Sequence, residues 1–170
     1  IVWKLRFPRV VSAGVVGAAL AISGGTYQGL FRNPLADPYL IGVAGGASLG
    51  ATIVLLTRVP LYFQGFSVLT LVAFIGGLSA VLSAYYIARK TEGLHLATLI
   101  LAGVAISSMT VAITSFLIIR SDPDVRSLLS WILGGFIGVN WGDVVKILPY
   151  VAIGSIVMIV YGRIMNILQL

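Results

Sequence analysis

Long stretches without charged residues alternate with short polar clusters along this chain. Uncharged stretches cover 10–31, 38–57, 59–88 and 94–119, and a last apolar stretch runs from about 147 to 167. A helix that crosses the hydrocarbon core of a membrane needs about 20 apolar residues. The pattern therefore predicts five spans: Val10–Phe31, Pro38–Thr57, one within 65–88, Leu94–Ile119 and 147–167.

The segment 127–142, SLLSWILGGFIGVNWG, is too short to span comfortably and predicts a surface or re-entrant helix. Its Trp131 and Trp141 suit the interfacial belt, where aromatic side chains sit at the level of the lipid headgroups. The sequence thus predicts an all-α fold, a polytopic transmembrane bundle of about five spans plus one short helix. Residues 1–170 are interpreted as one partial transmembrane domain.

Small residues recur every four positions in several of these spans. Gly17 and Gly25 belong to such a stripe in the first span, and Gly42, Gly46 and Gly50 form one in the second. Glycine stripes let two helix backbones approach closely within a membrane. We therefore expect both stripes to pack against neighbouring helices.

Between the first two spans lies the motif RNPLADP, residues 32–38. Pro34 cannot continue a helix because it lacks an N–H group and clashes with the preceding turn. Asp37 suits a helix N-cap, and Pro38 suits the first helical turn. The motif is expected to end one helix and to begin the next within a few residues.

The composition fits this membrane assignment. The chain is 59% hydrophobic and 9% charged, with a mean hydropathy of +1.07, whereas soluble domains carry about 25% charged residues. We attribute the net charge of +6 to loops beside the membrane rather than to nucleic-acid binding. Cysteine is absent, which excludes disulfides and thiolate metal sites. Because the chain starts without methionine and ends abruptly, we expect it to be a fragment of a longer protein.

Candidate catalytic chemistry is sparse. GASLG (46–50) matches the G-x-S-x-G nucleophile pattern, but Ser48 is expected inside a glycine-rich helix, where that pattern indicates packing rather than an esterase. The single histidine, His95, follows a glycine at an expected helix start and fits the membrane–water boundary. Acidic residues are nearly absent from the apolar stretches, which weakens the hypothesis of a proton-coupled carrier. Gln28 could bond a neighbouring helix or face a solute path, and its position alone favours neither.

Three segments resemble a known family. They are LRFPRVVSAGVVGAALAISGGTYQGLFRNPLADPYLIGVAGGASLGA (5–51), LILAGVAIS (99–107) and SWILGGFIGVNW (130–141). The first is similar to the R-x-P-R, Q, N-P-L-A-x-P and G-x-x-x-G-A succession of FecCD-type permeases. These are membrane subunits of type II ABC importers for vitamin B12, haem and iron–siderophore complexes. The resemblance covers nearly the whole chain and does not name the solute.

The resemblance implies roles for particular residues. Arg6 and Arg9 would dock a substrate-binding protein, and Asn33, Pro34 and Leu35 would form a cytoplasmic gate. Gln28, Leu96 and Thr98 would line the translocation path. The implied partners are a second permease subunit, two ATPase subunits, a periplasmic or lipid-anchored binding protein and membrane lipids, but no nucleic acid.

The same resemblance implies a multi-pass protein of the cytoplasmic membrane that is not itself an enzyme. No cofactor or metal is expected, and ATP hydrolysis would occur on the partner subunits. The alternative hypothesis is a secondary-active carrier with broken helices.

The implied topology opposes the positive-inside tendency. It would place four basic residues in the cytoplasm and seven outside, namely Arg32, Arg89, Lys90 and Arg163 against Lys4, Arg6, Arg9, Arg58, Arg120, Arg126 and Lys146. We favour the family topology because outer basic residues could meet acidic residues on a binding protein.

Overall fold

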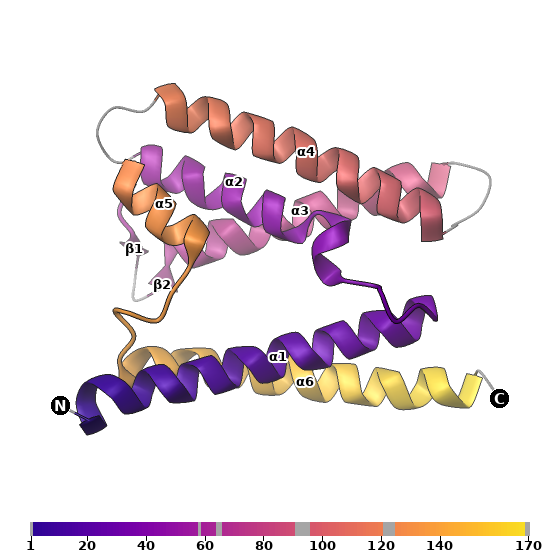
Figure 1. Ribbon diagram of the computed structural model, residues 1–170, viewed down its shortest axis with the longest axis horizontal. Helices are drawn as coiled ribbons and strands as arrows, with labels where there is room; N and C mark the ends of the chain where they lie inside the picture. Colours follow the sequence, from indigo (N-terminus) through magenta and orange to yellow (C-terminus); the bar gives the residue numbers. More distant parts are fainter. Residues whose placement is uncertain (1, 58, 64–65, 91–95, 121–124, 169–170) are drawn as a thin grey trace. The chain divides into compact units, whose positions relative to one another are not determined.

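The computed structural model describes residues 2–57, 59–63, 66–90, 96–120 and 125–168, and almost all of them are helical (Figure 1). They form two compact units, Ile1–Asp37 with Gly135–Leu170 and Pro38–Gly134. Each unit is described by itself. The predicted all-α fold is confirmed, apart from one very short hairpin.

The first unit is a pair of long helices. A π-helical turn, η1 (Val2–Arg6), leads into α1 (Phe7–Phe31), which packs along α6 (Trp141–Leu168). Both helices start at the same end of the unit and run parallel (Figure 1). Pro8 lies in the first turn of α1, where its missing N–H would have no helical partner in any case.

The second unit is built around α2. It begins with the 3₁₀ turn η2 (Pro38–Ile41) and continues as α2 (Val43–Leu56). A two-stranded antiparallel hairpin follows, β1 (Tyr62–Phe63) with β2 (Phe66–Ser67). The remaining helices are α3 (Val68–Lys90), α4 (Leu96–Arg120) and the short α5 (Val125–Leu133). Helix α2 contacts α3, α4 and α5 (Figure 1).

Backbone-to-backbone contact holds α2 and α3 together. A methyl group added to Gly46 would overlap the Gly76 carbonyl oxygen and lie 2.6 Å from the Ala80 Cβ. One turn later, a methyl group on Gly50 would lie 2.5 Å from the Val72 carbonyl oxygen. The partners on α3 move backward as α2 moves forward, so the two helices are antiparallel. Glycine and alanine at these positions allow the two backbones to approach closely because they carry no large side chain.

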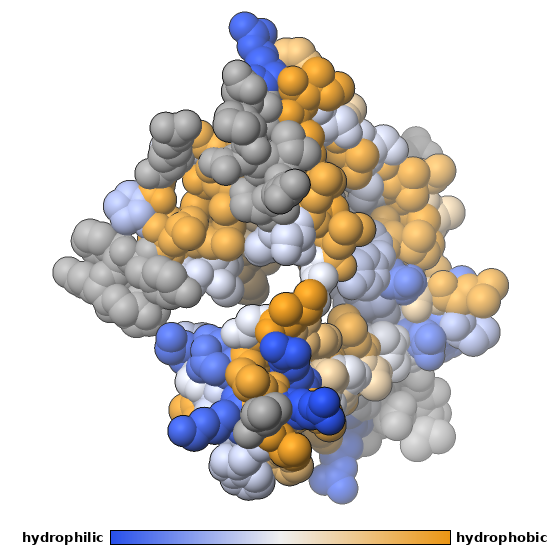
Figure 2. Space-filling view, turned by 60° about the vertical axis from the view of Figure 1, so that its left-hand side comes forward, coloured by the Kyte–Doolittle hydropathy of each residue, from blue (hydrophilic) through white to orange (hydrophobic). Residues whose placement is uncertain are grey.

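The described helices keep most of their large apolar side chains on the outside. Exposed examples occur on every long helix, such as Leu101 at 70% and Phe74 at 67%. Figure 2 shows the resulting hydrophobic areas with separate hydrophilic patches. In the described chain, α1 with η1, α3, α4 and α6 are long and apolar enough to cross a membrane. This surface suits a lipid solvent, in which exposed apolar side chains are favourable.

The structure corrects three predicted boundaries. The second span was expected to be one helix from Pro38, but an α-helix begins only at Val43, after Gly42 with φ 92°. Its 14 residues are fewer than the roughly 17 that span a membrane. The last helix begins at Trp141 rather than near 147, and it contains Pro149. The short helix ends at Leu133, before two glycines of positive φ.

The break at Gly42 has a packing cause. Gly103 of α4 lies directly against the 3₁₀ turn, because a methyl group there would overlap the Leu40 carbonyl oxygen and lie 2.6 Å from the Ile41 Cα. The missing side chain of Gly103 lets the turn lie directly against α4, and the positive φ of Gly42 redirects the chain into α2. Asp37 consequently does not cap α2, whose N-cap position is Gly42 without any side-chain cap.

Candidate functional site

The break after α1 is a rigid double turn. Arg32 has φ 48°, and its N–H donates to the Gly29 carbonyl at 3.3 Å. The Asn33 N–H donates to the Gln28 carbonyl at 3.1 Å. These two bonds are a Schellman motif, which satisfies the last carbonyls of a helix and usually has glycine at the left-handed position. Arginine at this position carries the steric penalty of the left-handed region.

A second turn follows at once and is centred on Pro34. The Ala36 N–H donates to the Asn33 carbonyl at 3.0 Å, and the Leu35 N–H donates to Asn33 Oδ1 at 2.9 Å. Proline is common at the second position of such a turn because its ring fixes φ near the value that the turn requires. Leu35 lies at the tip of the turn with 82% of its surface exposed. The three gate candidates thus form one rigid turn that presents an apolar side chain.

The candidate path residues belong to different units. Gln28 is exposed on the last turn of α1, and its backbone carbonyl serves the Schellman motif. Leu96 and Thr98 are half-buried on the first turn of α4. Gln28 therefore belongs to the first unit, which we call the α1–α6 unit because α1 packs along α6. Leu96 and Thr98 belong to the second unit, Pro38–Gly134, which we call the α2–α4 unit. His95 lies outside the described residues.

An aromatic cluster occupies the opposite end of the α1–α6 unit. The Trp3 and Phe7 rings stack with centroids 4.9 Å apart, and Trp141 lies 5.5 Å and 5.8 Å from them. The Trp141 indole N–H donates to the Trp3 carbonyl at 3.0 Å. This hydrogen bond and the stacked rings fix the start of α6 against the start of α1. Stacked aromatic pairs of this kind add about 0.5–1.5 kcal/mol beyond the area that they bury.

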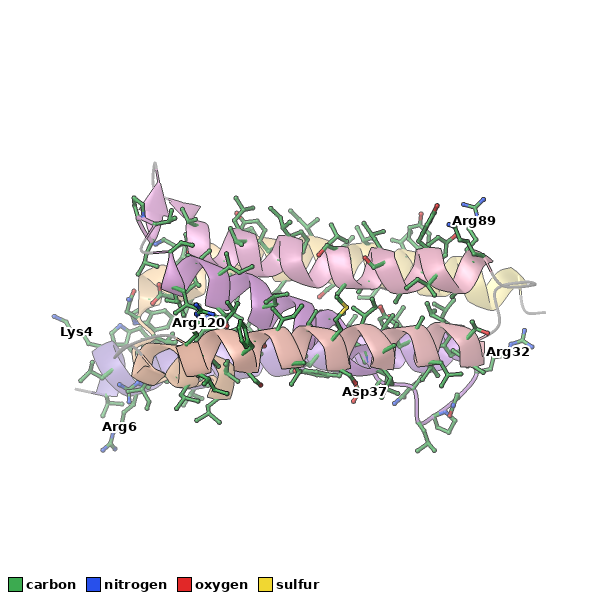
Figure 3. All side chains as sticks on the ribbon, turned by 90° about the horizontal axis from the view of Figure 1, so that it is seen from above. Lys4, Arg6, Arg32, Asp37, Arg89 and Arg120 are labelled. Atoms are coloured by element: carbon green, nitrogen blue, oxygen red, sulfur yellow. The ribbon has the colours of Figure 1, made fainter. Side chains whose placement is uncertain are left out.

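The two arginines of R-x-P-R differ in their surroundings. The half-buried Arg9 donates from its guanidinium to the Ile137 carbonyl, and its Nε is buried without a described partner. Arg6 and Lys4 are both exposed, and their side chains extend away from the start of the helix in different directions (Figure 3). Sequence reasoning treated the two arginines alike. The bond of Arg9 crosses 128 positions, so no local pattern could have indicated it.

The start of α6 carries a cap that the sequence analysis missed. The Gly142 N–H donates to Asn140 Oδ1 at 2.8 Å, and the Asn140 N–H donates to Asp143 Oδ2 at 3.1 Å. This reciprocal pattern is a capping box, in which two otherwise unpaired donors are satisfied by side chains. The signal was present in the sequence as an asparagine followed three residues later by an acid.

The predicted packing glycines fall into two groups. Gly42, Gly46 and Gly50 all lie against neighbouring backbone or side-chain atoms within the second unit. Gly17 and Gly25 are exposed on α1, and a methyl group on either would meet no described atom within 4 Å. The stripe on α2 is thus an interhelical contact of the described chain, and the stripe on α1 is not.

Ser48 lies in the middle of α2 and is half-buried. The nucleophile motif that it resembles requires a sharp turn between a strand and a helix. The backbone around Ser48 is continuous α-helix over Val43–Leu56, so its hydroxyl is not presented in that way. The described residues also include no group of three or more metal-ligating His, Cys, Asp or Glu side chains.

Comparison with known proteins gives consistent relatives. A family model, the FecCD transport family, matches residues 1–170. The chain is 43% identical over 170 residues to the cobalamin import system permease protein BtuC of Halobacterium salinarum, covering 99% of the chain and 44% of that protein. It is 41% identical over 146 residues to the vitamin B12 import system permease protein BtuC of Escherichia coli, covering 82% of the chain and 42% of that protein.

Two further similarities agree with these. The chain is 36% identical over 169 residues to an uncharacterized ABC transporter permease protein, YvrB, of Bacillus subtilis, covering 99% of the chain and 48% of that protein. A solved structure described as an inward-facing metal-chelate type ABC transporter superposes with a TM-score of 0.86 at 30% identity. That match covers 100% of the chain and 53% of the other. The chain therefore spans about half the length of the relatives that it matches.

Proposed function

Because this chain belongs to the FecCD transport family, we propose that it is part of the permease subunit of an ATP-binding-cassette importer. The observation that carries the proposal is the match of the family over the whole chain, combined with four described helices long enough to cross a membrane. The chain is a multi-pass membrane protein, and we place it in the cytoplasmic, or inner, membrane.

The proposed solute is a large metal chelate of the cobalamin type. Two relatives above 40% identity are named for cobalamin or vitamin B12 import, and the superposed structure is described as a metal-chelate type transporter. Iron–siderophore complexes and haem belong to the same chemical class and are the alternatives. The solute would pass between this permease and a second permease subunit.

The energy for transport is proposed to come from partner proteins. The sequence has neither a phosphate-binding loop nor a set of acidic residues in its apolar stretches. Two ATPase subunits would therefore drive the cycle, and a substrate-binding protein would deliver the solute. No catalytic step is assigned to this chain.

We propose that the turn Asn33–Pro34–Leu35 acts at the cytoplasmic gate. Two hydrogen-bonded turns in succession hold its backbone, so the turn can move as one piece. The exposed Leu35 side chain could close an aqueous path by apolar contact. Gln28 at the end of α1, with Leu96 and Thr98 at the start of α4, remain the proposed path residues.

The docking proposal now separates the two arginines. Arg6, together with Lys4, is exposed and is available to acidic groups of a binding protein. Arg9 holds the Ile137 carbonyl, so we assign it the role of positioning the segment before α6. Complementary charge of this kind accelerates encounter and fixes register more than it adds affinity.

The break between η2 and α2 keeps one alternative open, since broken helices also occur in secondary carriers. A complementation experiment distinguishes among the candidate solutes of the family. Cells that lack their own cobalamin permease would receive the complete reading frame with its ATPase and binding protein, and uptake of labelled cobalamin would be measured. We expect uptake that is lost when the binding protein is omitted. Uptake of an iron chelate or haem instead would reject cobalamin, and uptake that needs neither partner would support the carrier.

A further inference from the structure

Two threonines of the α2–α4 unit bury hydroxyl groups that have no described hydrogen-bond partner. Thr52 is 1% exposed and Thr114 is 6% exposed, and the Oγ1 atom of each is unpaired. Several other hydroxyls within the helices donate to a carbonyl one turn earlier in their own helix: Thr26 to Ile22 at 2.8 Å, Ser108 to Val104 at 2.9 Å and Thr110 to Ile106 at 3.0 Å. Thr52 and Thr114 do not make this local bond.

The packing of α2 on α4 places the two threonines at one level. A methyl group on Gly42 would lie 3.3 Å from the Gly103 carbonyl oxygen, and one on Gly45 would lie 2.5 Å from Thr110 Oγ1 and 3.3 Å from the Ser107 Cα. The contacts advance together along both helices, so α2 and α4 run parallel. Seven residues further, or about two helical turns, Gly45 is replaced by Thr52 and Ser107 by Thr114.

Both threonines also lie on the correct faces of their helices. Gly45 and Thr52 of α2 are separated by seven residues, and so are Ser107 and Thr114 of α4. Residues at such intervals share one face of an α-helix. If α2 and α4 stay in contact at this level, the seam between them passes from close glycine contact to a pair of buried hydroxyls.

From this arrangement we propose that Thr52 and Thr114 form a buried water-binding site between α2 and α4. A buried hydroxyl without a partner is unfavourable in apolar surroundings. Buried water molecules typically bind such groups and make about three hydrogen bonds. Helix geometry places the Ser48 and Thr110 carbonyls one turn before the two hydroxyls, where each can accept a second hydrogen bond. One water molecule between the helices would thus bond both hydroxyls, with the two carbonyls as further acceptors nearby.

The position along the helices suits such a site. Thr52 lies four residues before Leu56, at the end of α2, and Thr114 lies six residues before Arg120, at the end of α4. Both are therefore within two turns of a helix end, where water of the interface is near. The site would fasten α2 to α4 at the end opposite to the Gly42 break.

A double-mutant cycle in the complete protein tests this site. Thr52→Val and Thr114→Val remove a hydroxyl each while keeping the side-chain shape, and the double variant removes both. Unfolding in mixed micelles would be measured for each, with Thr26→Val as the control because its hydroxyl is satisfied within α1. Because interhelical hydrogen bonds in membranes contribute modestly to stability, each single variant should raise the equilibrium constant of unfolding about three- to tenfold.

The double variant should be less destabilised than the product of the two single effects, because no orphaned hydroxyl remains. Thr26→Val should combine multiplicatively with Thr52→Val. Multiplicative behaviour of Thr52→Val with Thr114→Val would overturn the shared site. A high-resolution structure of the complete protein should contain a water density within hydrogen-bond distance of both hydroxyls. Direct bonding between the hydroxyls, or bonding of each to its own helix, would overturn the water assignment.

Discussion

A graded series of glycine-to-alanine substitutions tests the packing of α2 on α3. The methyl group of Gly46→Ala would overlap the Gly76 carbonyl oxygen and lie 2.6 Å from the Ala80 Cβ, where ordinary contacts begin at 3.4 Å. These neighbours are backbone or Cβ atoms and cannot rotate away, so the helices must separate by about 1 Å, and overpacking of this kind costs about 1–3 kcal/mol. Gly50→Ala meets the Val72 carbonyl oxygen at 2.5 Å and should behave similarly.

Two matched variants set the lower end of the series. Gly77→Ala would place its methyl group 3.1 Å from the Val43 carbonyl oxygen, which a small adjustment can relieve. Gly17→Ala meets no described atom within 4 Å and should gain up to about 1 kcal/mol from helix propensity. Unfolding of the complete protein in mixed micelles would rank the variants. If Gly46→Ala were no less stable than Gly77→Ala, the close α2–α3 contact would be refuted.

Three further predictions concern the ends of α1. Arg6→Ala should slow capture of the binding protein severalfold at low salt without changing stability. Arg9→Ala should instead destabilise the protein by about 1.5–3 kcal/mol because it removes a charged hydrogen bond. Capture kinetics and unfolding midpoints check both variants, and equal capture defects would contradict the division of roles. Arg32→Gly should stabilise the protein by about 1 kcal/mol through relief of the left-handed backbone, while Arg32→Ala, which loses the same charge, should not; equal unfolding free energies would contradict this cause. Leu35→Ala should leave stability within about 0.5 kcal/mol because the side chain is exposed, yet should increase ATP-independent leakage of solute from loaded proteoliposomes; an unchanged leak would argue against the gate.

The helical membrane fold could be predicted because lipid imposes a simple requirement. A span must satisfy its own backbone hydrogen bonds and present apolar side chains to the lipid, so charge-free stretches mark the long helices well. The end of α1 was also predictable, since Pro34 prevents continuation of the helix. The small-residue spacing in 42–50 indicated close packing, and the structure places these glycines against α3 and α4.

The break at Gly42 could not be predicted from local signals. Asp37 and Pro38 are typical of a helix start, yet the turn that follows packs against Gly103, about 60 positions away, which lies against Leu40 and Ile41. The role of Arg9 could not be predicted for the same reason, because its partner, the Ile137 carbonyl, lies 128 positions later in the sequence. Tertiary contacts of this kind override local preferences.

The start of α6 was misplaced for a different reason. Asp143 and Lys146 interrupt the hydrophobic pattern, so hydropathy alone moved the expected start toward Pro149. The capping box at Asn140 and Asp143 is a local signal and could have located the true start. Pro149 is accommodated within the helix, as membrane helices allow when neighbouring groups satisfy the freed carbonyl.

The central proposal is that this protein provides a passive path and that partner proteins supply the energy. The most direct measurement uses the complete permease in proteoliposomes, with solute accumulation followed under either ATP or an imposed ion gradient. We predict accumulation against a gradient only when the ATPase, ATP and the binding protein are all present. Uphill accumulation by the permease alone, driven by a proton or sodium gradient, would contradict the claim.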